Sequence, residues 1–206
     1  WSATRQRFSV LVALRAREAR QAPEAGVTLV GREREIALLE EKWTRSRAGA
    51  GQAVLVSGEP GIGKSRLVQS VEGLVDRAVG ARVLTAQCSP YHQERSLFPI
   101  AGMVQRDLVA LEPDKSDAER LEALERLLRE RGWSLEETMP LLGPLLSLNV
   151  SYPPLQLAPE RQQQLLLEHL VALLVETAEV SPVLLVVEDL HWADDGTLRL
   201  IGMLID

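Results

Sequence analysis

Short apolar runs along the chain predict β-strands at residues 53–57, 81–87 and 183–187. The last run contains no polar residue, which is typical of a strand in a parallel sheet that helices cover on both faces. Between the first two runs, apolar residues recur at helical spacing over 65–79. Strand, helix and strand in this order form a βαβ unit, so the pattern predicts an α/β fold with a parallel, helix-covered sheet.

A long and mostly helical insertion separates the second predicted strand from the third. Ser116 and Glu119 have the spacing of a capping box, which predicts a helix that ends at Gly132. A second, longer helix is predicted from Glu160 to Val180. The apolar segment MPLLGPLLSL is interrupted by two prolines and a glycine, so it predicts at most short helical turns, and SYPPLQLAP predicts an extended loop.

The first 26 residues combine five arginines with a few apolar positions. A basic helix of this kind could contact a membrane or nucleic acid, but five arginines are few for either partner. We therefore expect residues 1–26 to form an exposed helical linker from an upstream domain. A turn at Val30-Gly31 and a further helix with apolar residues at helical spacing should follow it.

A glycine-rich segment, GEPGIGKS, connects the first predicted strand to the helix after it. The spacing G-x-x-x-x-G-K-S is that of the phosphate-binding loop of nucleoside triphosphatases. Glycines let backbone N–H groups approach the phosphates, the lysine reaches the β- and γ-oxygens, and the serine hydroxyl is a ligand of Mg²⁺. The predicted strand before the loop and helix after it make a chance match improbable. The candidate nucleotide-binding residues of this loop are Gly58, Glu59, Pro60, Gly61, Ile62, Gly63, Lys64, Ser65 and Arg66.

Two acids, Glu188 and Asp189, directly follow the third predicted strand. The carboxyl ends of parallel strands meet at one edge of the sheet, where ligands bind. We expect Glu188 to hold Mg²⁺ together with Ser65, and Asp189 to activate the attacking water. The alternative is a strand that simply ends in solvated acids.

Composition narrows the function classes. The 206 residues are 46% hydrophobic and 25% charged, which suits one globular domain or slightly more. A formal net charge of −6 argues against nucleic-acid binding over the whole surface. No apolar run has the length of a membrane-spanning helix, and the single cysteine, Cys88, fits a reducing compartment. We therefore expect a cytoplasmic protein with no membrane contact and no direct nucleic-acid binding.

Five segments, LVGRE, GEPGIGKSRLV, CSPYH, YPPLQLAPERQ and LLVVEDLHWAD, occur in this order. Together they resemble the AAA-type regulatory ATPase region of the signal-transduction ATPases with numerous domains. That region is found attached to bacterial class III adenylate/guanylate cyclases and in large LuxR-type transcriptional regulators. The resemblance covers residues 27–206. It implies the N-terminal part of a P-loop ATPase domain that binds ATP or ADP with Mg²⁺, controls an attached output domain and assembles into a nucleotide-dependent oligomer.

The resemblance also implies roles for individual residues. Backbone around Val30, Gly31 and Arg32 should lie near the adenine. The acids stand in the order Glu188-Asp189, the reverse of the commoner Asp-Glu order in related ATPases, and the shorter Asp189 should make hydrolysis slow. His191, Trp192 and Asp194 match the family signature with roles left open, and we favour ordinary packing for the first two. Cys88 and His92 could form a metal site, although packing is the favoured interpretation.

Some features of the resembling family do not occur within these residues. In that family, later strands carry a polar sensor residue, and a helical lid carries an arginine. One of the later strands lies between the strand that ends in the two acids and the strand that precedes the glycine-rich loop. We therefore expect a domain truncated at its C-terminus. Three function classes stay open: a slow regulatory ATPase, a remodelling AAA ATPase that works mechanically, and a P-loop phosphotransferase.

Overall fold

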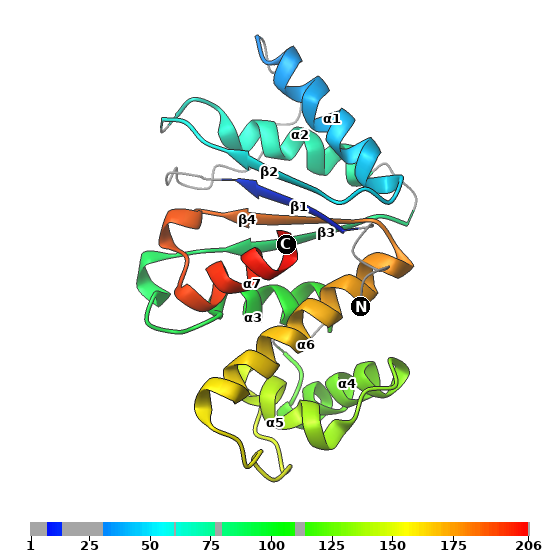
Figure 1. Cartoon of the computed structure of the whole chain (residues 1–206), viewed down its shortest axis with the longest axis vertical. Coiled ribbons are helices and arrows are strands. Elements are labelled where there is room, and N and C mark those ends of the chain that lie inside the picture. The colour runs from blue at the N-terminus through cyan, green and yellow to red at the C-terminus, as the bar shows by residue number, and fades with distance from the viewer. Residues whose placement is uncertain (1–7, 14–30, 60, 77–79, 110–113, 206) are drawn as a thin grey trace.

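A four-stranded parallel sheet lies at the centre of the protein (Figure 1). The computed structural model describes residues 8–13, 31–59, 61–76, 80–109 and 114–205. In chain order the strands are β1 (Phe8–Ala13), β2 (Gln52–Val56), β3 (Arg82–Gln87) and β4 (Val183–Glu188). Their order across the sheet is β2-β1-β4-β3. This arrangement confirms the prediction of an α/β fold with a parallel sheet.

The first strand corrects the prediction of a helix at the N-terminus. Residues 8–13 form β1, which pairs in parallel with β2 on one side and β4 on the other. Helical propensity is a weak local preference, and a central strand gains two ladders of hydrogen bonds that override it. β1 thus occupies the position that the resemblance assigned to a later strand. The other residues of the predicted linker, 1–7 and 14–26, lie outside the described residues.

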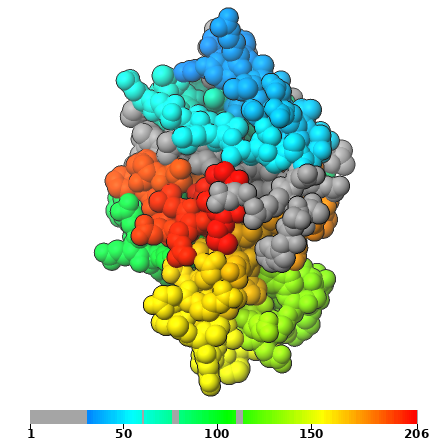
Figure 2. All heavy atoms as spheres, in the orientation of Figure 1, coloured from blue at the N-terminus to red at the C-terminus, as the bar shows by residue number. Residues whose placement is uncertain are grey.

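Helices cover both faces of the sheet (Figure 1). Helices α1 (Glu33–Arg47) and α2 (Lys64–Asp76) pack on one face, against Leu184 and Val186 of β4. The opposite face of β4 packs against α3 (Phe98–Met103), α6 (Pro159–Val180) and α7 (Asp195–Ile205). In the space-filling view α7 lies at the surface in the middle of the molecule (Figure 2). All five apolar residues of β4 are buried, as its sequence predicts.

β2 forms the strand predicted before the glycine-rich loop, and it is only partly covered. Its side chains alternate between half-buried and exposed, and Leu55 is 61% exposed. Val54 and Val56 pack against the α1 and α2 side, so Ala53 and Leu55 point to the other face. β2 is an edge strand of the described sheet, and an edge strand is covered less completely than a central one.

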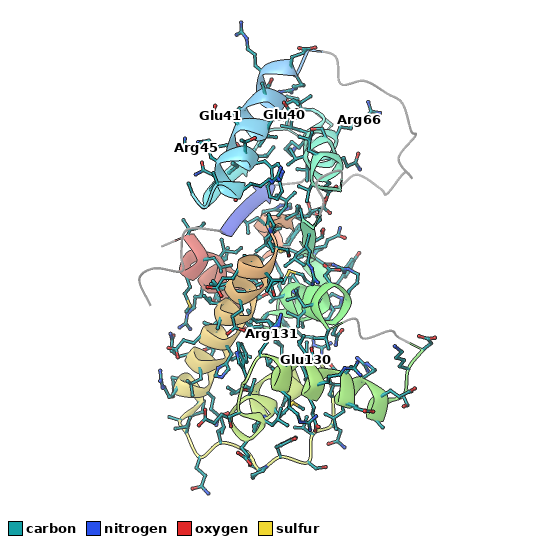
Figure 3. All side chains as sticks on the ribbon, turned by 90° about the vertical axis from the view of Figure 1, so that its right-hand side faces the viewer. Glu40, Glu41, Arg45, Arg66, Glu130 and Arg131 are labelled. Carbon is teal, nitrogen blue, oxygen red and sulfur yellow. The ribbon has the colours of Figure 1, made fainter. Side chains whose placement is uncertain are left out.

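The insertion between β3 and β4 is helical, as predicted, and extends to one end of the molecule (Figure 1). Its helix α4 (Asp117–Glu130) begins with the predicted capping box at Ser116. At the other end of α4, Arg131 donates a hydrogen bond to Thr177 of α6 (Figure 3). The prediction of only short turns in MPLLGPLLSL was wrong, because α5 (Leu135–Leu145) includes both prolines. Burial of its apolar side offsets the backbone hydrogen bonds that the prolines cannot donate.

Candidate functional site

The glycine-rich loop connects β2 to α2 at the carboxyl edge of the sheet. Gly61 and Gly63 have φ angles of +80° and +93°, which residues with a Cβ rarely adopt. A Cβ on Gly63 would meet no other atom within 4 Å, so backbone conformation rather than crowding explains this glycine. α2 begins directly after the loop and has no acidic residue in its first turn. The loop therefore lies at a helix N-terminus that is suited to an anion.

Lys64, the first residue of α2, folds back over the loop. Its Nζ donates hydrogen bonds to the carbonyl oxygens of Gly58 (2.8 Å) and Glu59 (2.7 Å), and the residue is only 8% exposed. Both acceptors are neutral, so the ammonium charge is available to pair with an anion. Ser65 is half-buried beside it, whereas Arg66 is exposed on α2, at the end of the molecule where α1 lies (Figure 3). Pro60 lies outside the described residues.

The segment before α1 contacts the loop. Arg32 donates from Nη2 to the carbonyl oxygen of Ile62 (3.2 Å) and from Nη1 to Glu35 (2.6 Å). The hydrogen bond from Arg32 lowers the pKa of the Glu35 carboxyl below its usual value. Gly31, at φ +82°, donates its N–H to Glu33, while Val30 lies outside the described residues. The structure thus brings the α1 start and the loop together.

A cavity of about 250 Å³ lies between the start of α1, β2 and the loop. Two of the residues that line it, Leu38 (50% exposed) and Ile62 (49% exposed), have apolar side chains, and Val54 and Val56 of β2 line it as well. Lys64 and Arg32 line it as well. An apolar cavity beside a cationic loop suits a flat aromatic ring that carries an anionic tail. Sequence analysis missed Leu38, because its contribution depends on how α1 packs beside β2.

The two acids lie at the same edge of the sheet as the loop. Strand β4 ends at Glu188, which is half-buried, and Asp189 follows with 7% exposure. Val187 of β4 and Leu55 of β2 both pair with Val12 of β1, so the ends of β2 and β4 are level. Two strand spacings separate them, which amounts to about 10 Å between backbones. This distance is suited to a metal-bound phosphate held between the loop and the acids.

The residues present fit ATP and Mg²⁺. The loop offers N–H groups at a helix start and a buried ammonium, which are the groups that a triphosphate requires. The Ser65 hydroxyl and the Glu188 carboxylate supply oxygen atoms, the ligand type that Mg²⁺ prefers. Within the described residues, no cluster of three or more histidines, cysteines or acids forms a separate metal centre.

The structure also places the residues of the LLVVEDLHWAD segment whose roles were open. His191 is exposed, and its ring lies 4.9 Å from the half-buried ring of Trp192. Asp194 is buried and accepts hydrogen bonds at the start of α7, a role that sequence analysis did not assign. Burial raises the pKa of the Cys88 thiol to about 12, with further contributions from Asp194 and Asp189. The centroid of the His92 ring lies 3.9 Å from the centroid of the Phe98 ring.

Comparisons with known proteins extend these observations. Residues 28–206 match a family model described as "AAA ATPase domain". An uncharacterized protein of Rhizobium meliloti (strain 1021) is 25% identical over 177 residues, which are 86% of this chain and 17% of that protein. The chain therefore spans less than a fifth of the curated relative that it matches. No solved structure matches it significantly. None of the described helices is long and apolar enough to cross a membrane.

Proposed function

Because the chain belongs to the AAA ATPase domain family, we propose that its ATP-binding module is a nucleotide-dependent switch within a larger bacterial signalling protein. The observation that carries this proposal is the position of Lys64 and the two acids. A buried ammonium over a glycine-rich helix start and a pair of carboxylates share one sheet edge. This pairing of cation and acids is what MgATP needs, and a loop alone would not provide it.

The parts of the site divide the work of binding and hydrolysis. Lys64 and the loop N–H groups would hold the β- and γ-phosphates. Ser65 and Glu188 would hold Mg²⁺, which would neutralise phosphate charge. Asp189 orients the attacking water and accepts its proton. The adenine fits the cavity between α1 and β2, beside Gly31 and Arg32, because the apolar walls of this cavity lie next to the phosphate loop.

A regulatory role is supported by the size of the relative. The matched protein of Rhizobium meliloti is several times longer than the matched segment, as expected when an ATPase module controls attached domains. We propose a cyclase or DNA-binding output domain, in line with the family resemblance. A cytoplasmic location is proposed from the single cysteine, Cys88, which is buried as a free thiol.

The turnover rate tests the switch against the two other function classes. We expect MgATP binding together with hydrolysis well below the typical enzyme rate of about 10 s⁻¹, because a switch must persist in its bound state. The assay is release of labelled phosphate by the purified protein, with Lys64→Ala as the background control. Rapid hydrolysis without any partner would instead favour a remodelling ATPase. Phosphate transfer to an added small-molecule alcohol would favour a phosphotransferase.

A further inference from the structure

Asp194 makes more hydrogen bonds than the start of a helix requires. Its Oδ1 accepts from the N–H of Thr197 (2.9 Å), and its Oδ2 accepts from the Thr197 hydroxyl (2.7 Å), which together cap α7. Oδ1 also accepts from the N–H of Leu97 (2.8 Å), a residue 97 positions away in the segment that follows β3. The side chain is 7% exposed, so water contributes little to holding it.

This bond and a second one tie the segment after β4 to the segment after β3. At the other end of both segments, the N–H of Cys88 donates to the carbonyl oxygen of Glu188 (3.0 Å). Residues 188–194, which include both candidate acids, are thus attached at each end to residues 88–97. We call this pair of attachments the clasp.

The backbone within the clasp is held in an unfavourable conformation. Asp189 and Leu97 have φ angles of +55° and +61°, in the left-handed region that residues other than glycine seldom adopt. Such residues persist only where the surrounding structure holds them, and they concentrate at functional sites. Leu97 is held by its buried side chain and by the hydrogen bond to Asp194.

Gly196 brings the two segments close together. A Cβ at this position would collide with the Ser96 hydroxyl and would lie 3.0 Å from Cγ of Leu97. Only glycine therefore allows the start of α7 to pack this closely against the segment after β3. The same Cβ would lie 3.1 Å from Oδ1 of Asp194, so Gly196 leaves room for the oxygen that accepts from Leu97.

We propose that Asp194 is a positioning residue that, through the clasp, holds Glu188 and Asp189 at the distance from the phosphate loop that metal-bound nucleotide requires. This proposal rests on the proposed function, because it concerns the same site. Asp194 itself lies five residues beyond Asp189 and acts through the backbone. Without the bond from Leu97 to Asp194, the segment after β4 stays attached only through the N–H of Cys88. The left-handed turn at Asp189 then relaxes, and the two acids are no longer held at a fixed distance from the phosphate loop. Binding of the nucleotide phosphates by Lys64 and the loop N–H groups does not depend on it.

The test compares ATP affinity in Mg²⁺ with ATP affinity in EDTA, by calorimetry on the complete protein. We expect Asp194→Ala to reduce the affinity gain that Mg²⁺ provides by at least fivefold and to change the affinity in EDTA by less than twofold. Gly196→Ala should give the same pattern. Asp194→Asn keeps the oxygen that accepts from Leu97, so it should fold and keep the affinity gain that Mg²⁺ provides. If Asp194→Ala fails to fold, loss of that gain in Asp194→Asn would overturn the proposal.

Thr197→Val is the control for a purely structural role. It removes the Thr197 hydroxyl from Oδ2 but leaves the bond from Leu97, so it should lower the unfolding temperature and keep the Mg²⁺ effect. A folded Asp194→Ala or Gly196→Ala protein with an unaltered Mg²⁺ effect would overturn the positioning role alone. Equal loss of the effect in Thr197→Val would also overturn it. If the unaltered protein binds no ATP, the proposed function fails, and this proposal fails with it.

Discussion

Replacing Lys64 with methionine tests the phosphate loop most directly, because methionine keeps an apolar stem and removes only the ammonium. In the free protein that ammonium donates to the carbonyl oxygens of Gly58 and Glu59. Both residues are exposed, so water can hydrate the two carbonyls after the substitution. We therefore expect the free energy of unfolding without nucleotide to fall by only about 1 kcal/mol.

When ATP binds, the Lys64 ammonium exchanges its contacts with two carbonyl oxygens for contact with the phosphates. The effect of the substitution on ATP affinity follows from this exchange. Two unit charges 4 Å apart attract by about 4 kcal/mol at an effective dielectric constant of about 20. Giving up the two carbonyl contacts costs about 1 kcal/mol, because water can hydrate both exposed carbonyls. The difference of about 3 kcal/mol exceeds the roughly 1.4 kcal/mol of a tenfold change, so Lys64→Met should weaken MgATP binding by at least about tenfold.

Two measurements separate these effects. Calorimetric titration with MgATP gives the affinity, and urea unfolding without nucleotide gives the stability. Arg45→Met is the matched control, since it removes an exposed positive charge from α1 (Figure 3) and should change neither quantity appreciably. An affinity within twofold of the unaltered protein, with the fold intact by circular dichroism, would refute the assignment of residues 58–65 as a phosphate-binding loop.

The remaining predictions concern the two acids and Cys88. Asp189→Asn should lower single-turnover hydrolysis by on the order of a hundredfold and spare MgATP affinity, while Glu188→Gln should weaken MgATP binding. If Asp189→Asn weakens binding while Glu188→Gln lowers only hydrolysis, the roles of the two acids are exchanged. If neither substitution changes binding or hydrolysis, the two acids are only the solvated end of a strand. For Cys88, the pKa of about 12 in the folded protein exceeds the ordinary value of 9.0, so its contribution to stability is complete below pH 9 and is lost as the pH rises. Between pH 9 and about pH 12 this contribution to the unfolding free energy should fall by about 1.4 kcal/mol per pH unit. A Cys88→Ala protein whose unfolding free energy falls just as steeply would contradict this account.

Local features of the fold and of the site could be predicted from sequence because they depend on residues close together in the chain. The spacing from Gly58 to Ser65 specifies a loop that leads into a helix, and α2 does begin at Lys64. Likewise, the run of apolar residues before Glu188 indicates a buried strand, and β4 is buried on both faces. The capping box at Ser116 needs only its partner at Glu119. In each case the feature depends on hydrogen bonds, or on a pattern of apolar residues, among positions only a few residues apart in the sequence.

Other features arise only from contacts between distant segments. Residues 8–13 become a strand because β2 and β4 offer ladders on both sides, which no local pattern reveals. α5 tolerates two prolines because its apolar side is buried. The bond from Leu97 to Asp194 joins loops nearly a hundred residues apart. Sequence alone therefore determined which residues can bind phosphate and metal, because that chemistry belongs to the side chains and to the local backbone. Tertiary structure decided how these residues are held relative to one another, because distance across a sheet depends on strand order and on the packing between loops.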